Sequence, residues 1–199
     1  GGSNNYTGAL TGIIDSTAWS NAGEGPVTII FYVNDSAGNW DTANVVINRD
    51  VTDPIIVSIN SPSSGAWFNS TPPSYSLSIT ESNLDDIWYT LDGGSNNYTG
   101  ALTGIIDSTA WSNAGEGPVT ITFYVNDFSG NWDSMSVDIN RDTLAPTITI
   151  ISPLSGTFGI DAPDFIVEID DDTLHTMWYS LNGSVNIIFT VNGTIDQNN

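Results

Sequence analysis

Hydrophobic and polar residues alternate with a period of two along much of the chain. In the segment 119–125, one face of a strand would carry Val119, Ile121, Phe123 and Val125. Clusters of Gly, Pro, Asn, Asp and Ser separate such segments at a spacing of roughly ten residues, which is typical of a sandwich of short strands. The pattern therefore predicts an all-β protein with that face in its core.

The alternation predicts strands in the middle of the chain at residues 55–59, 75–79, 87–91, 98–102, 104–107, 119–126 and 135–140. No stretch of useful length has the period of a helix. Residues 127–131 contain Gly130 and Asn131, which suit the left-handed backbone of a tight turn. We expect a hairpin there between the last two strands.

The chain contains a long internal repeat. Residues 1–29 recur without change as residues 93–121, an offset of 93 − 1 = 92 residues, and the similarity continues to residues 50 and 142. A repeat of this length is the size of one small β-domain. We expect the C-terminal part of a domain at 1–50, a complete domain at 51–142 and the truncated N-terminal part of a further domain at 143–199. Each end segment would need a partner, either further sequence or strands donated by another subunit.

Several positions return even where the repeat has diverged. Trp88 and Trp178 correspond to each other, and both fall on a strand with the spacing of a core tryptophan in a sandwich. We therefore expect both in the core. Trp40 and Trp132 lie beside the hairpin asparagines and are expected to be exposed. Exposed aromatic rings could stack on surface glycans, or could pack on a neighbouring domain.

Composition narrows the possible partners and chemistry. The 23 acidic residues outnumber two basic ones, giving a net charge of −21 that excludes nucleic acid as a partner. No run approaches the about 18 apolar residues of a membrane span, so we expect no membrane insertion in this segment. The chain has neither Cys nor Lys, and its one histidine is His175, so nucleophilic triads, Schiff bases and histidine metal clusters lack their parts. We expect no catalytic residue and no enzyme.

The order of motifs resembles a known family. A W-Y-x-L strand at 88–91 is followed by a tryptophan loop at Trp111, a V-T-I-x-F-Y-V-N-D-x-x-G-N run at 119–131, and D-x-x-x-P at 142–146. This order resembles the immunoglobulin-like repeats, similar in appearance to fibronectin type III, that occur in series on archaeal and bacterial surface proteins. The chain departs from adhesive pilin-type domains in having no Lys for a crosslink. It departs from cadherin-like junctions because Asp53 is replaced by Ala145 in the next copy.

The resemblance implies tandem immunoglobulin-like β-sandwich domains of about 92 residues. It also implies a structural segment of a long extracellular surface or filament protein that assembles head to tail with itself into a fibre or sheath. The alternative is the stalk or spacer of a cell-surface adhesin or S-layer protein whose binding function lies elsewhere. In both cases the localisation would be extracellular.

Acidic and amide residues near the hairpins and junctions make calcium the one metal that the sequence favours. The candidate ligands are Asp35, Asn39, Asp41, Asp50, Asp53, Asp127, Asn131, Asp133 and Asp142. The alternative is that Asp and Asn are simply good turn formers, and turn chemistry accounts for every one of these positions. No other cofactor is indicated.

Two further sets of residues bear on a surface role. Six glycosylation sequons occur, at Asn5, Asn34, Asn69, Asn97, Asn182 and Asn192, a number close to that expected by chance. The two arginines, Arg49 and Arg141, precede the junctions that Pro54 and Pro146 stiffen. We expect these four residues to set the angle between successive domains, the arginines through contacts with a carboxylate or carbonyl.

Overall fold

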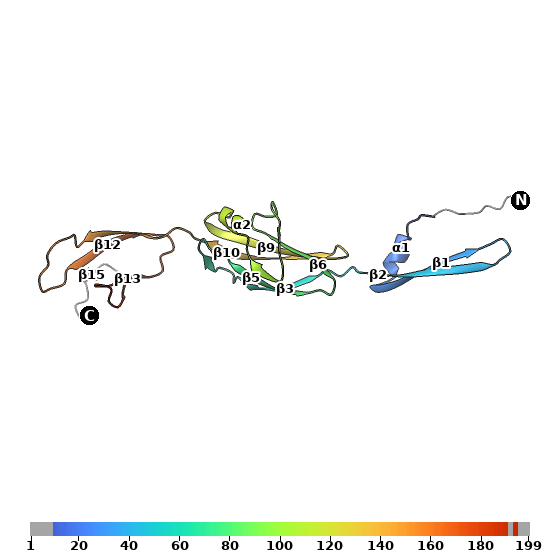
Figure 1. The fold of residues 1–199 in the computed structure, drawn as a ribbon, viewed down its shortest axis with the longest axis horizontal. Coiled ribbons are helices and arrows are strands. Elements are labelled where there is room, and N and C mark those ends of the chain that lie inside the picture. The colour runs from blue at the N-terminus through green and yellow to red at the C-terminus, as the bar shows by residue number, and fades with distance from the viewer. Residues whose placement is uncertain (1–9, 191–192, 195–199) are drawn as a thin grey trace. The chain divides into compact units, whose positions relative to one another are not determined.

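The computed structural model describes residues 10–190 and 193–194, which form mainly β-strands and two short helices (Figure 1). The chain divides into two compact units, Gly1–Arg141 and Asp142–Asn199. The predicted all-β character is confirmed. Within the described residues no helix is long and apolar enough to cross a membrane.

Eight strands in the C-terminal part of the first unit form two sheets (Figure 1). The five-stranded sheet has the order β4-β10-β9-β6-β7 and the three-stranded sheet the order β3-β5-β8. Their bounds are β3 Ile55–Ser61, β4 Trp67–Phe68, β5 Ser74–Thr80, β6 Leu84–Thr90, β7 Tyr98–Thr99, β8 Thr103–Ile105, β9 Gly117–Asp127 and β10 Trp132–Arg141. Neighbours are antiparallel except β4 and β10. The predicted strands and hairpin are present, although the strand expected at 98–102 ends at Thr99.

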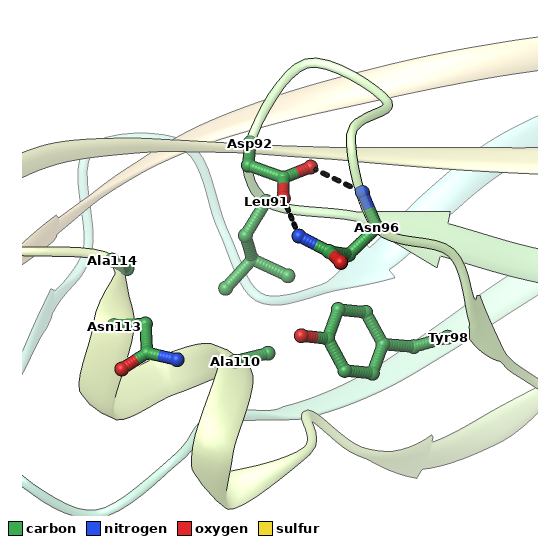
Figure 2. A pocket seen from close by; sticks show the side chains of 7 residues that line it. All are labelled: Leu91, Asp92, Asn96, Tyr98, Ala110, Asn113 and Ala114. Atoms are coloured by element: carbon green, nitrogen blue, oxygen red, sulfur yellow. Dashed lines mark hydrogen bonds between the residues drawn. The ribbon is translucent and has the colours of Figure 1, made fainter.

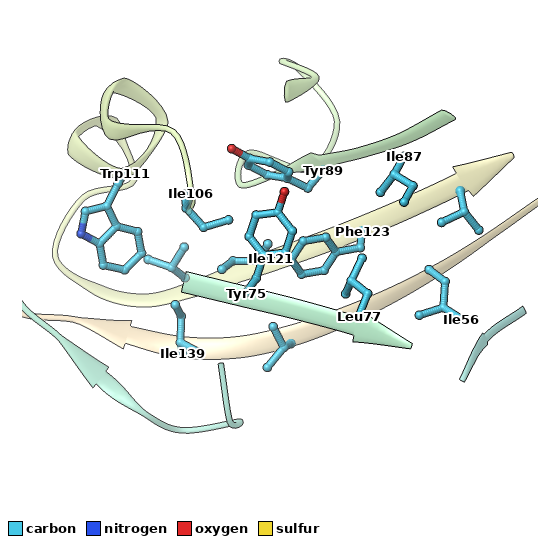
Figure 3. Packing of buried hydrophobic residues seen from close by; sticks show 13 residues of the cluster. Ile56, Tyr75, Leu77, Ile87, Tyr89, Ile106, Trp111, Ile121, Phe123 and Ile139 are labelled. Atoms are coloured by element: carbon cyan, nitrogen blue, oxygen red, sulfur yellow. The ribbon is translucent and has the colours of Figure 1, made fainter. Parts of the chain in front are cut away.

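The two sheets enclose one apolar core, shown in Figure 3. The predicted inward face of β9 is buried, with Val119 exposing 4 % of its surface and Ile121, Phe123 and Val125 none. Tyr75 on β5 packs against Phe123, with ring centroids 5.0 Å apart. Aromatic pairs at this distance add to the stabilisation from buried area.

The core tryptophan is Trp111, and the prediction that Trp88 and Trp178 occupy the core is wrong. Alternation along β6 turns Ile87 and Tyr89 inward, so Trp88 faces outward and is half-buried. The corresponding Trp178 is 56 % exposed. Trp111 is fully buried, and its indole Nε1 donates to the Asn69 carbonyl at 2.9 Å.

Trp111 lies on α2 (Ser108–Asn113), a short helix that the strand pattern missed. The Asp107 carboxylate caps this helix by accepting from the backbone N–H groups of Thr109 and Ala110, each at 2.9 Å. A helix of six residues is long enough to direct one tryptophan side chain into the core. The hydrophobic period is not detectable in so short a segment.

The remaining elements are copies of parts of this fold. At the N-terminal end, α1 (Ser16–Asn21) precedes a hairpin of β1 (Gly25–Asn34) and β2 (Trp40–Arg49). In the second unit, β11 (Thr147–Ser152), β12 (Asp164–Asp170) and β15 (Gly193–Thr194) form one sheet, and β13 (Met177–Tyr179) and β14 (Ile187–Phe189) form another. The β11–β12 pairing repeats that of β3 and β5.

Candidate functional site

The hairpin β1–β2 presents an apolar face that its copy buries. Phe31 and Val33 are 56 % and 67 % exposed, whereas the corresponding Phe123 and Val125 are fully buried. The same contrast separates Val45 and Ile47 from their copies on β10, which belong to the core. We call this surface the hairpin face and define it by Val27, Ile29, Phe31, Val33, Val45 and Ile47. A contiguous apolar surface of this kind is typical of an interaction site.

The second unit contains a copy of the opposite sheet that is only partly covered, since Phe165 on β12 packs against Tyr179 and Phe189. Ile148 pairs with Ile169 as Ile56 pairs with Ile79, so Ile148 occupies the register position of Ile56. Ile56 is 2 % exposed in the core, whereas Ile148 is 63 % exposed. The two ends of the chain therefore carry copies of the two sheets that pack together in the middle.

The hairpin aspartates stabilise the turns in which they lie. The Asp127 carboxylate accepts from the backbone N–H groups of Ser129 and Asn131 at 2.8 and 3.0 Å, and from the Asn131 side-chain amide at 2.8 Å. Asp35 makes the same three bonds to Ala37 and Asn39, and those from Asn39 chiefly hold the pKa of Asp35 below its usual value. Turn formation thus uses these carboxylates.

The other predicted calcium ligands do not converge with them on one point. Asp133 accepts from the backbone N–H of Ile56 at 2.9 Å and so joins β10 to β3, while Asp41 accepts from Thr42. Among the residues that the structure describes, no three His, Cys, Asp or Glu side chains gather as a metal site. Calcium binding stays a prediction, and Asp50 and Asp142 have a different set of contacts.

Asp50 reaches forward into the domain that follows it. Its carboxylate accepts from the Asn83 side chain at 2.7 Å and from the backbone N–H of Thr52 at 3.1 Å, and its carbonyl accepts from Asn131 at 3.5 Å. The bond from Thr52, followed by that from Asn83, lowers the pKa of Asp50. In the second unit, Asp142 accepts in the same way from the Thr173 hydroxyl at 2.5 Å. Thr173 stands where Asn83 stands in the preceding copy.

The arginines make their contacts inside their own repeats. Arg141 donates to the Gly115 carbonyl at 3.1 Å and to Glu116 at 2.9 Å, and its guanidinium lies 5.8 Å from the centroid of Trp111. Arg49 likewise donates to the Gly23 carbonyl and lies over Trp19. The predicted carboxylate and carbonyl contacts are present, but they hold the loop that precedes β9 or β1 in the same repeat. The contact that reaches beyond the repeat is made by the next residue, Asp50 or Asp142.

The two junction prolines differ in burial, whereas the described sequon asparagines are all exposed. Pro54 is fully buried, whereas Pro146 is exposed. The four sequon asparagines within the described residues, Asn34, Asn69, Asn97 and Asn182, are all exposed. Asn5 and Asn192 lie outside the described residues. Asp53 and His175 are both exposed.

A small hollow among the described residues is too small for a substrate. It lies between α2 and the loop that contains Asp92 and Asn96, and its volume is about 60 Å³ (Figure 2). The Asp92 carboxylate accepts from the backbone N–H and the side-chain amide of Asn96, which lowers its pKa. Ligand pockets usually measure about 300–1,000 Å³, and this space would hold about two water molecules.

Comparison with known proteins does not assign the chain to a family. No protein family model matches the chain, and no curated protein matches it. Function is therefore inferred from the exposed apolar faces and from the hydrogen bonds at the junctions.

Sequence reasoning found some of these residues and missed others. The hairpin and junction aspartates were singled out, but as metal ligands. The junction partners Asn83 and Thr173 were not, because they correspond in the repeat yet differ in residue type. The outward direction of Trp88 could have been predicted from the alternation along β6. Ile87 and Tyr89 lie on the inward face, so Trp88 between them must face outward.

Proposed function

We propose that this chain is a structural repeat segment of a long extracellular surface or filament protein. Its immunoglobulin-like sandwich domains follow one another in series and assemble head to tail into a fibre or sheath. The observation that carries the proposal is that β1 and β2 present the same apolar face that β9 and β10 pack against a second sheet, so that this face needs the same kind of cover.

Covering the hairpin face would stabilise an assembly. Full burial of an exposed Val, Ile or Phe side chain contributes about 1.5–3 kcal/mol. Phe31, Val33, Val45 and Ile47 are between 39 % and 67 % exposed, so covering all four contributes about 3–6 kcal/mol. Association costs at least about 4 kcal/mol in lost freedom of motion, so a stable contact also requires burial of apolar side chains on the covering surface, such as Ile148. The β11–β12 sheet of a second copy of the chain is a suitable covering surface. It is the repeat copy of the β3–β5 sheet, which covers the equivalent face of β9 and β10 in the middle of the chain.

Charge and surface chemistry support an extracellular location. A net charge of −21 keeps a long polymer soluble and repels nucleic acid. A chain without Cys relies on packing and does not depend on the redox state outside the cell. The described sequon asparagines are accessible to a glycosylating enzyme.

Matched substitutions on the two faces of β1 test the proposal. Phe31 belongs to the hairpin face and Tyr32 to the opposite face, and they are similarly exposed at 56 % and 68 %. In sedimentation velocity runs the wild-type chain should form oligomers that grow with concentration. Phe31→Glu should reduce them strongly, because it places a charge in the contact, whereas Tyr32→Glu should retain them. A wild-type chain that stays monomeric at every concentration would contradict strand complementation.

The junction contacts favour a second candidate, the stalk or spacer of a surface adhesin or S-layer protein. Asp50 bonds to Asn83, and Asp142 bonds to Thr173, so each repeat ends with a hydrogen bond to the loop that follows. Repeated contacts of this kind suit a spacer, which would remain monomeric and hold a binding domain at a distance. The sedimentation experiment separates the two candidates.

A further inference from the structure

Three aromatic side chains lie together on the outer face of the five-stranded sheet. Trp88 on β6 is directly opposite Tyr124 on β9, and their rings are stacked with centroids 5.4 Å apart and planes 5° apart. Trp132 on β10 is opposite Asn126 of β9, two residues beyond Tyr124 and therefore on the same face. We call Trp88, Tyr124 and Trp132 the aromatic platform.

The platform borders an open hollow of about 500 Å³, which is within the range of ligand sites. Gly94, Asn97, Asn126 and Gly130 complete its lining, so no charged residue lines it in a chain with 23 acidic residues. Trp132 is 58 % exposed. A neutral surface of aromatic rings and amides suits a ligand with apolar faces and uncharged polar groups.

A glycosylation sequon lies at the edge of this platform. Thr99, the third residue of the sequon Asn97-Tyr98-Thr99, is directly opposite Trp88 in the β6–β7 pair. Asn97 is exposed, precedes Thr99 by two residues and lines the hollow with Trp88. A sugar attached to the Asn97 amide would start its chain beside the stacked rings.

The outward aromatic residues recur although the strands around them change. Trp88 returns as Trp178, and Tyr124 and Trp132 stand where Tyr32 and Trp40 stand in the preceding copy. Nearby positions differ, as Ser36 and Phe128 or Val46 and Asp138 show. The core does not explain this recurrence, because none of these residues belongs to it. Their recurrence is explained if the rings have a role on the surface.

We propose that the aromatic platform is the docking site of a glycan carried by Asn97, whose first pyranose ring packs on it. The carbon–hydrogen face of a pyranose is apolar and flat, and burying it against an aromatic ring stabilises both. The hydroxyl and amide groups of the sugar can bond to the Asn126 side chain, whose Oδ1 already accepts from the backbone N–H of Asp86 at 3.0 Å. The attached glycan would cover the most exposed ring of the platform, and the inference does not depend on how the chain assembles.

The test uses the whole chain secreted from a eukaryotic host that attaches N-glycans. One version keeps only the Asn97 sequon and a matched version keeps only that of Asn69, which is exposed but remote in sequence from the platform residues. An endoglycosidase then trims each glycan to a single N-acetylglucosamine. In proton NMR spectra the acetyl methyl signal of the Asn97-linked sugar should shift upfield relative to the Asn69-linked sugar, because an aromatic ring current acts on it.

The substitution Trp88→Ala should remove most of this upfield shift, because Trp88 is opposite Thr99 of the sequon, and it spares the core, to which Trp88 does not belong. The trimmed Asn97 version should also melt a few degrees above the same chain without sugar, and Trp88→Ala should abolish that gain. Equal methyl shifts at the two sites would overturn the proposal. So would a host that modifies Asn69 but leaves Asn97 bare, or indole signals that respond to added diacetylchitobiose but not to the attached sugar.

Discussion

At the residue scale, the duplication places the same residue in a packed environment in one copy and in an open environment in the other. The effect of packing can therefore be measured separately from the effect of residue type. Gly104 and Gly12 are equivalent positions of the repeat. A Cβ atom built on Gly104 would lie 2.6 Å from the Tyr75 hydroxyl oxygen and 2.7 Å from its Cζ, inside contact distance of a buried ring. At Gly12 no atom lies within 4 Å.

We therefore expect Gly104→Ala to destabilise the complete domain by about 1–3 kcal/mol, since the Tyr75 ring must move within a packed core. Gly12→Ala should change the free energy of unfolding by less than about 0.5 kcal/mol, as surface substitutions usually do. Urea unfolding followed by tryptophan fluorescence measures both. Equal effects at the two positions would show that the core does not close on Gly104.

The same contrast holds for the hairpin aspartates. Asp127 is 1 % exposed and Asp35 is exposed, yet both accept three hydrogen bonds from their turns. Asp127→Ala should destabilise the two-sheet fold by about 1–3 kcal/mol, because it removes a buried carboxylate together with the three hydrogen bonds that it accepts. Asp35→Ala should have a smaller effect, since water can replace the carboxylate. Thermal unfolding of both variants tests the difference, and a larger loss for Asp35→Ala would contradict it.

At the element scale, what could be predicted depended on the length of each hydrophobic pattern. The 11 residues of β9 give a clear period of two, so its inward face followed from the sequence, and the predicted bounds 119–126 lie within two residues of the observed ones. The six residues of α2 are too few to establish a period, although Asp107 could have been recognised as an N-cap. With the helix missed, its tryptophan was missed as well, and Trp88 was assigned the core position that Trp111 occupies.

A titratable carboxylate, that of Asp50, joins the end of β2 to the loop before β6 through its hydrogen bond with Asn83. The pKa of Asp50 is below its ordinary value of 3.8, chiefly because of the hydrogen bond from Thr52 and then that from Asn83. A carboxyl with a lowered pKa in the folded state stabilises that state above pH 3.8, and this stability is lost as the pH falls through the lowered pKa. Acidification should therefore loosen the junction.

Carbon-detected NMR of the Asp50 carboxyl should give a pKa below 3.8 in the wild-type chain. Asn83→Ala should raise this pKa toward 3.8, because one of the two leading hydrogen bonds is lost. Asn60→Ala is a suitable control, since the Asn60 side chain bonds to Ser58 and Ser78 within the three-stranded sheet. A pKa unchanged by Asn83→Ala would remove the junction role assigned to this pair.

At the scale of the whole molecule, the repeat supplies both halves of a contact. The hairpin face and the β11–β12 sheet are copies of surfaces that pack together between residues 51 and 141. Each contains side chains, such as Phe31 and Ile148, that are exposed although their copies are buried. The repeat length of 92 residues and the all-β character could be predicted from the sequence alone. The identity of the covering surface could not, because burial depends on which chain segment lies opposite.

Electron microscopy of the purified chain at high concentration tests the central claim most directly. We predict fibres with a regular axial repeat in the wild-type preparation and in Tyr32→Glu, and single particles in Phe31→Glu. Adding a calcium chelator to the same samples also tests whether the junction aspartates hold calcium, since fibres that depend on the ion would dissolve. Single particles in the wild-type preparation, with and without chelator, would contradict the filament and leave the chain as a spacer.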